Sequence, residues 1–186
     1  MNTLVLISVI LISLILIISM YYYNSFIKNK NKVKNAWSDI DVYLKKRYDV
    51  IPNLVETVKG YANQEKEVLE NIVKYRNQTQ TNNASKEDRV ASEMKLSGAL
   101  QSMFAVVENY PDLKSNQNFL ALQNSLSEIE NDIEDSRRYY NAVVRDYNNT
   151  VELFPGLLFA KLFNFSSENS FEVAQNEKEN VKISFK

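Results

Sequence analysis

The side chains of this chain that could perform acid-base or metal chemistry are mostly carboxylates, because its 186 residues include no histidine and no cysteine. Thiolate nucleophiles, imidazole bases, disulfides and zinc sites built from Cys or His are therefore excluded. Asp39 and Asp41 are two residues apart, which places them on different faces of a helix. A run of five more acids contains Glu128, Glu130, Asp132, Glu134 and Asp135. This run is typical of a solvated surface, with a hard-cation site as the alternative, and we expect no enzyme activity and no cofactor.

A repeated Tyr-Asn dipeptide is the second pattern of interest, in the stretch RRYYNAVVRDYNN at residues 137–149. Tyr140-Asn141 and Tyr147-Asn148 are seven residues apart, which returns a helix to within about 20° of one direction. The tyrosines continue an apolar seam, so we expect them to pack with their hydroxyls at the bundle edge. The asparagines lie beside the seam. They are either exposed in an Asn-rich chain or paired across the bundle, where they would fix helix register.

The proposed partners for such pairing are Asn53, Glu56 and Asp49. The candidate interaction or register residues are accordingly Asn53, Glu56, Arg137, Tyr140, Asn141, Arg145, Tyr147 and Asn148.

An apolar run from Leu4 to Met20, LVLISVILISLILIISM, is interrupted only by serines. A helix of about 20 apolar residues can cross a bilayer, and serine hydroxyls can bond to their own helix. We therefore expect residues 1–27 to form a transmembrane anchor. A cleaved signal peptide is the alternative, but no Lys or Arg precedes the run and the run is longer than the usual signal core.

The residues after the run indicate its orientation. Tyr21, Tyr22 and Tyr23 are typical of the membrane interface, and Lys28 and Lys30 begin a cluster of four lysines that ends at position 34. Because positive charge collects on the cytoplasmic side, the N-terminus is predicted to lie outside and the bulk of the chain in the cytoplasm. The lysines could also contact anionic headgroups.

Beyond the anchor, apolar residues recur at steps of three and four, which is typical of helices that bury one stripe. The first such pattern covers 33–79, with Arg47 as a polar intruder, and Pro52 predicts a kink or a short break in it. A polar connection at 82–85 opens a second helix, and a third follows at 116–150.

These patterns predict an all-α protein: an N-terminal transmembrane helix, then an antiparallel bundle of three to four long helices, the first kinked near Pro52. The bundle would occupy residues 28–165 and a polar C-terminal tail 166–186. Only three glycines and three prolines are present, which disfavours the turns of a sheet.

The end of the predicted bundle is rich in aromatic residues, and Pro155 suits the first position of a short helix there. Its candidate hydrophobic contact residues are Phe154, Phe159, Phe163 and Phe165. This segment either folds back to cap the bundle or contacts the membrane or a partner.

Three stretches carry a resemblance to a known family: WSDIDVYLKKRYDVIPNLVETVKGYA at 37–62, RRYYNAVVRDYNN, and ELFPGLLFAKLFNF at 152–165 with Phe171-Glu172. They are similar to the signature blocks of the LemA family of bacterial membrane proteins. The resemblance implies a membrane helix followed by a cytoplasmic helical bundle, without established enzymatic activity. Asn164 departs from the pattern, which often has Gly in a Phe-Gly-Phe element, and Asp135 stands where small apolar residues are common.

Members of that family are often encoded beside membrane metallopeptidases, and one relative is associated with magnetosome membrane formation. We therefore expect a non-enzymatic structural or interaction protein that organises or recruits membrane partners. The alternative is a regulator or adaptor of an envelope enzyme such as a membrane metallopeptidase. The expected partners are the lipid bilayer and proteins, either a second copy or such a peptidase. With 22 basic and 23 acidic residues, we expect no nucleic acid, and no small-molecule substrate is expected.

Overall fold

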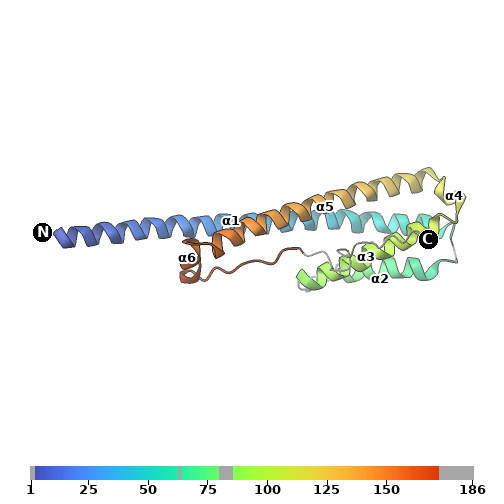
Figure 1. Ribbon diagram of the computed structural model, residues 1–186. Coiled ribbons are helices and arrows are strands. Elements are labelled where there is room, and N and C mark those ends of the chain that lie inside the picture. Colours follow the sequence, from blue (N-terminus) through green and yellow to red (C-terminus); the bar gives the residue numbers. More distant parts are fainter. Residues whose placement is uncertain (1–2, 63, 80–85, 172–186) are drawn as a thin grey trace, which may run out of the picture. The chain divides into compact units, whose positions relative to one another are not determined.

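The computed structural model describes residues 3–62, 64–79 and 86–171, and within these ranges all regular structure is helical (Figure 1). The helices are α1 (Thr3–Lys59), α2 (Lys66–Thr79), α3 (Lys86–Val107), α4 (Pro111–Lys114), α5 (Gln117–Glu152) and α6 (Gly156–Leu162). The predicted all-α class is therefore confirmed. The described residues form two compact units, the first within residues 1–39 and 136–186 and the second within residues 40–135. Helices α1 and α5 contribute to both.

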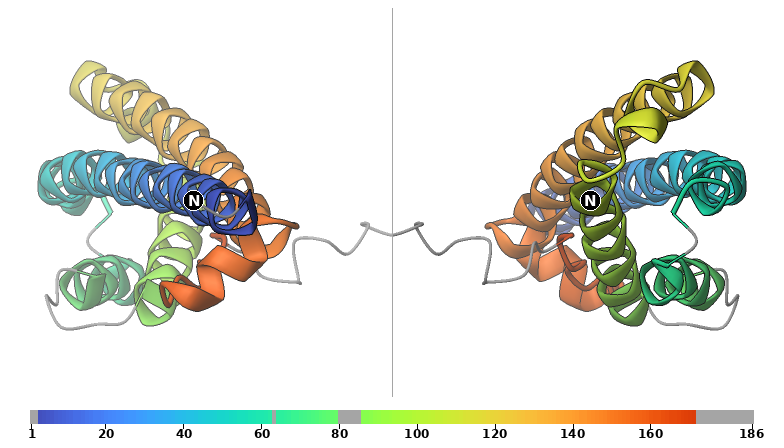
Figure 2. Two further views of the ribbon diagram at one scale, coloured as in Figure 1. Left: turned by 90° about the vertical axis from the view of Figure 1, so that its left-hand side faces the viewer. Right: turned by 90° about the vertical axis from the view of Figure 1, so that its right-hand side faces the viewer.

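In the second unit, α1 and α5 run antiparallel, since Arg47 of α1 contacts Glu130 and Tyr61 contacts Asn116 at the start of α5. Helices α2 and α3 lie side by side (Figure 2). The apolar stripes predicted from the sequence meet in the core of this unit. Its buried residues include Ile40, Leu44, Ile51, Leu54, Val58, Leu69, Ile72, Leu96, Leu100, Met103, Val107, Phe119, Leu126, Ile129 and Ile133.

The long helix α1 is continuous through Pro52, so of the two expected alternatives, a kink or a short break, the break at Pro52 is corrected. Proline lacks the N–H that would bond to the carbonyl of Tyr48 four residues earlier. Arg76 of α2 supplies the missing donor, because its Nε donates to that carbonyl at 2.8 Å. The helix therefore continues through Pro52 to Lys59, where the chain turns at Gly60 and Tyr61, and α2 begins at Lys66.

The later helices follow the predicted boundaries closely. Helix α3 ends at Val107, before Pro111, and α5 covers almost the whole predicted range of 116–150. The predicted polar connection at 82–85 lies outside the described residues, as does the tail beyond residue 171.

The first unit joins α1, the end of α5 and α6. Trp37 packs edge-on against Tyr140 at a centroid distance of 5.4 Å, and Asn29 donates to the hydroxyl of Thr150 at 3.3 Å. These contacts make α1 and α5 antiparallel here too. Helix α6 lies beside α1 (Figure 1). Buried residues of this unit include Phe26, Val33, Ala36, Tyr140, Val144, Tyr147, Val151 and Ala160.

The beginning of α1 is long and apolar enough to cross a membrane, and its large apolar side chains from Leu4 to Ile17 are exposed. The serines of this stretch bond to their own helix, as predicted: Ser8 Oγ donates to the carbonyl of Val5 and Ser13 Oγ to that of Val9, each at 2.8 Å. These features fit a single-pass membrane protein.

Candidate functional site

Four side chains on one face of α5 bind a segment of the chain that follows α6. We call Tyr140, Asn141, Tyr147 and Asn148 the Tyr-Asn ladder, and residues 166–171 the held segment. The held segment has no regular secondary structure of its own. All six hydrogen bonds described here between the ladder and the held segment go to main-chain atoms.

Each asparagine forms two hydrogen bonds with one residue. Asn148 Nδ2 donates to the carbonyl of Glu168 at 2.9 Å, and the N–H of Glu168 donates to Asn148 Oδ1 at 2.9 Å. Asn141 and Phe171 repeat the arrangement, at 3.0 Å from Nδ2 to the carbonyl and 2.6 Å from the N–H to Oδ1. An asparagine amide thus presents one donor and one acceptor to a peptide, as a neighbouring β-strand would.

Each tyrosine adds one hydrogen bond. The hydroxyl of Tyr147 donates to the carbonyl of Ser166 at 2.9 Å, and that of Tyr140 donates to the carbonyl of Asn169 at 3.1 Å. Each Tyr-Asn dipeptide therefore contacts two residues that are two apart in the held segment. The contacts of Tyr140-Asn141 repeat those of Tyr147-Asn148 with a shift of three residues along the held segment.

The spacing of the dipeptides explains this repetition. Seven residues of α-helix advance about 10.5 Å, and three residues of extended chain advance about 10 Å. The two advances match, so identical side chains can bind the held segment at both positions. The held segment runs antiparallel to α5, because the later dipeptide binds its earlier residues.

Phe171 anchors the end of the held segment. Its side chain is buried. The ring centroids of Phe171 and Trp37 are 6.1 Å apart, and the guanidinium of Arg137 lies 4.5 Å from the ring centroid of Phe171. Arginine over an aromatic face is an attractive cation–π arrangement. The ladder therefore fixes the backbone, and Phe171 is the one side chain of the held segment that is buried.

The phenol of Tyr147 gives the ladder a predicted pH dependence. Burial, and secondarily the nearby carboxylate of Glu168, raise the pKa of Tyr147 above its ordinary value. A group whose pKa is raised by folding stabilises the fold fully below its unfolded pKa, and this contribution is lost as the pH rises through the folded pKa. We expect the held segment to stay bound at neutral pH and to loosen in the alkaline range above about pH 10.

Emission from Trp37 can test this prediction, because it is the single tryptophan of the chain and contacts Phe171. An alkaline red shift is expected in the wild type, and a smaller one in Tyr147→Phe. The same shift in both proteins would contradict the assignment to Tyr147.

The ladder lies in a region that known sequences share. The family model for the LemA family matches residues 36–185, which is most of the chain. The chain belongs to the LemA family. A relative from Metamycoplasma hominis, described as Protein LemA, is 27% identical over 179 residues, covering 91% of this chain and 80% of the relative.

In this LemA family member, Asn164 replaces the glycine that the resemblance leads one to expect, and its backbone explains why asparagine is tolerated. Its φ is 58°, in the left-handed region where asparagine is the usual alternative to glycine. The N–H of Phe165 donates to the carbonyl of Ala160 at 2.9 Å, which completes a Schellman end to α6. The departure therefore keeps the turn that leads the chain into the held segment.

The structure gives the ladder asparagines a partner that the sequence analysis did not identify. Asn141 and Asn148 are half-buried, and the partners of their amides are main-chain atoms of the held segment. Asn53 and Glu56, proposed as pairing partners, are exposed residues of α1 in the second unit. Arg145 is exposed, with Nε 3.9 Å from Asp146.

The second unit contains a buried ionic network that the sequence analysis missed. Arg47 is fully buried and forms an ion pair with buried Glu93 of α3. Glu93 also accepts a hydrogen bond from the hydroxyl of Tyr48. Arg47 Nη1 donates to Glu130 at 2.7 Å and to the hydroxyl of Ser97 at 3.0 Å.

A signal for this pair was present in the sequence. Glu93 precedes Leu96, Leu100 and Met103 at steps of three and four, so it occupies a seam position of its helix just as Arg47 does. A buried arginine requires an acid, and a seam glutamate is the natural candidate. Glu130, assigned to a solvated acidic run, is half-buried and belongs to this network. Within the described ranges, no group of three or more acidic side chains could hold a metal ion.

Proposed function

We propose that this LemA family member is a membrane-anchored, non-enzymatic interaction protein whose helical bundle lies in the cytoplasm and recruits a membrane partner. The cytoplasmic side is supported by the lysines at 28 and 30, which lie on the C-terminal side of the apolar run, because no Lys or Arg precedes the run. The absence of histidine and cysteine from the sequence supports a role without catalysis. Because the Tyr-Asn ladder binds the chain's own held segment, a partner needs another surface.

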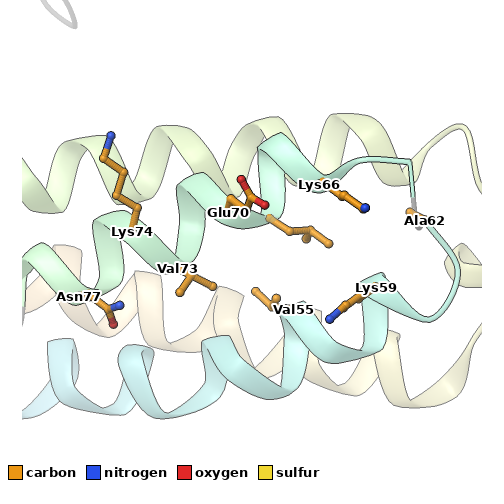
Figure 3. A pocket seen from close by; sticks show the side chains of 9 residues that line it. Val55, Lys59, Ala62, Lys66, Glu70, Val73, Lys74 and Asn77 are labelled. Atoms are coloured by element: carbon orange, nitrogen blue, oxygen red, sulfur yellow. The ribbon is translucent and has the colours of Figure 1, made fainter.

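An apolar groove flanked by lysines in the second unit is the observation that best supports this proposal. It lies between the end of α1 and α2, with a volume of about 540 Å³, and Figure 3 shows Val55 and Val73 in it. Its lining residues are Val55, Lys59, Ala62, Lys66, Leu69, Glu70, Val73, Lys74 and Asn77. We call it the α1–α2 groove.

The chemistry of the α1–α2 groove favours an acidic amphipathic helix as its occupant. Val55, Val73 and Leu69 provide an apolar floor, and Val73 is 42% exposed. Three lysines and one glutamate surround this floor, which leaves an excess of positive charge. Helices with one apolar face bind grooves between helices, and carboxylates beside that face would meet the lysines.

Site-specific crosslinking tests the proposal. A photoreactive residue at Val73 of the full chain in native membranes is expected to give a recurrent adduct, and mass spectrometry should map it to an acidic amphipathic helix of the partner. The same residue at Val42, an exposed valine of α1 that does not line the groove, is the matched control.

Charge reversal at Lys59 and Lys66 should reduce the Val73 adduct strongly and leave the fold unchanged by circular dichroism. Equal adducts at positions 42 and 73, or an adduct that survives charge reversal, would contradict an acidic partner helix. A metallopeptidase as the recurrent partner would favour the regulator or adaptor role over a scaffold.

A further inference from the structure

Helix α6 has two different faces. Its inner face, with Gly156 and Ala160 buried, packs within the first unit. The other face and the residues just before the helix are apolar and exposed: Leu153, Phe154, Leu157, Leu158 and Leu162. Phe154 is 80% and Leu162 67% exposed. A contiguous exposed apolar surface of this kind marks a contact with a partner or a membrane.

Aromatic contacts fix α6 next to the end of the apolar run of α1. Phe159 stacks on Tyr22 with centroids 5.1 Å apart and an interplanar angle of 8°. Phe163 packs edge-on against Tyr23 at 5.2 Å. Tyr22 and Tyr23 follow Met20, the last residue of the run, almost directly. The short helix therefore lies beside the residues that would occupy the membrane interface.

Two further features hold α6 in this place. A Cβ added to Gly156 would lie 2.2 Å from the carbonyl oxygen of Thr150, so the helix approaches the end of α5 as closely as only glycine allows. After α6, Phe165 packs on Phe26 with centroids 5.0 Å apart, and the held segment begins at the next residue. The Tyr-Asn ladder thus holds the part of the chain that follows α6 in sequence.

We propose that the exposed face of α6 lies in the boundary between headgroups and acyl chains of the same bilayer that α1 enters. Short amphipathic helices bind this boundary by burying an apolar face to a depth of about 5–10 Å. Basic side chains are available for anionic headgroups: Lys161 on α6 is exposed, and Lys30 lies 5.8 Å from the ring centroid of Phe165. The contact does not depend on the partner proposed for the α1–α2 groove.

Quenching by brominated lipids tests this contact in the full chain. In a Trp37→Phe background, single tryptophans are placed by Leu158→Trp on the exposed face of α6 and by Leu14→Trp in the apolar run. Tyr139→Trp is the control, because Tyr139 is an exposed aromatic residue of the same unit. Tyr139 is next to Tyr140, which packs on Trp37 of α1. Trp37 lies 15 residues beyond Tyr22, or about 22 Å further along α1 from the expected membrane interface.

The proteins are reconstituted into phosphatidylcholine vesicles with brominated acyl chains, with or without phosphatidylglycerol. Leu158→Trp and Leu14→Trp are expected to lose most of their emission, and Tyr139→Trp to keep it. Quenching of Leu14→Trp without quenching of Leu158→Trp would overturn the proposal. So would Leu158→Trp emission that responds to diluting the protein in lipid and not to bromine, since a second copy would then cover the face.

Discussion

Glu93→Ala is expected to lower the free energy of unfolding by about 3 kcal/mol, which is within the range for removing one partner of a buried ion pair. The substitution leaves Arg47 buried without its acid on α3, and Tyr48 without the acceptor of its hydroxyl. Glu130 stays as one ionic contact of Arg47, which keeps the loss at the low end of the range. Thermal unfolding of the full chain in detergent, followed by circular dichroism, should show a melting temperature lower by about 10 °C.

Two further variants separate the cost of an unpaired charge from a general loss of packing. Glu128→Ala removes an exposed acid of α5 and should change stability by no more than about 0.5 kcal/mol. The double variant Arg47→Met with Glu93→Leu removes both charges and should be more stable than Glu93→Ala, because no buried charge is left alone. A double variant less stable than Glu93→Ala would show that the ion pair itself, and not the isolated charge, determines the effect.

The second large effect is expected from Asn141→Ala combined with Asn148→Ala. Each substitution removes two hydrogen bonds to one residue of the held segment, at a cost of about 1–3 kcal/mol for each asparagine. A combined loss of about 3 kcal/mol corresponds to roughly a hundredfold rise in local opening. Hydrogen exchange at the amides of Glu168 and Phe171 should accelerate by about that factor, since both donate to the ladder.

Asn149→Ala is the matched control for the double variant, because Asn149 is an exposed asparagine next to the ladder. It should leave both exchange rates unchanged. Helix content should be the same in all variants, since alanine favours helix. Unchanged protection at Glu168 and Phe171 in the double variant would show that the ladder does not determine how the held segment binds.

Local patterns predicted the helices well, because burial of a stripe imposes the same step of three and four on each of them. Tertiary contacts decided between alternatives that the sequence left open. Pro52 does not break α1, because Arg76 donates to the carbonyl that proline leaves unbonded. No rule of local sequence could supply that contact from a residue on another helix.

The Tyr-Asn ladder was only half visible in the sequence for a similar reason. The repeat of seven identified one face of α5, but the partner is a main chain, and main-chain atoms leave no pattern in the residue types of 166–170. The side chain of Phe171 is the exception, and only the resemblance to the family indicates it. Its pocket needs Trp37 and Arg137 from two helices, which spacing alone does not bring together.

Because the Tyr-Asn ladder binds peptide groups, it places little restriction on the residue types of the held segment. The residue types from Ser166 to Ser170 can therefore change in evolution without altering the path of the main chain. Proline at position 168 is the exception, because it has no N–H to donate to Asn148. Phe171 lacks this freedom. For the same reason a label can be introduced in the held segment. A cysteine in place of Ser167 or Ser170, both exposed, would be the only thiol in the chain, and its label would report on binding to the Tyr-Asn ladder without disturbing it.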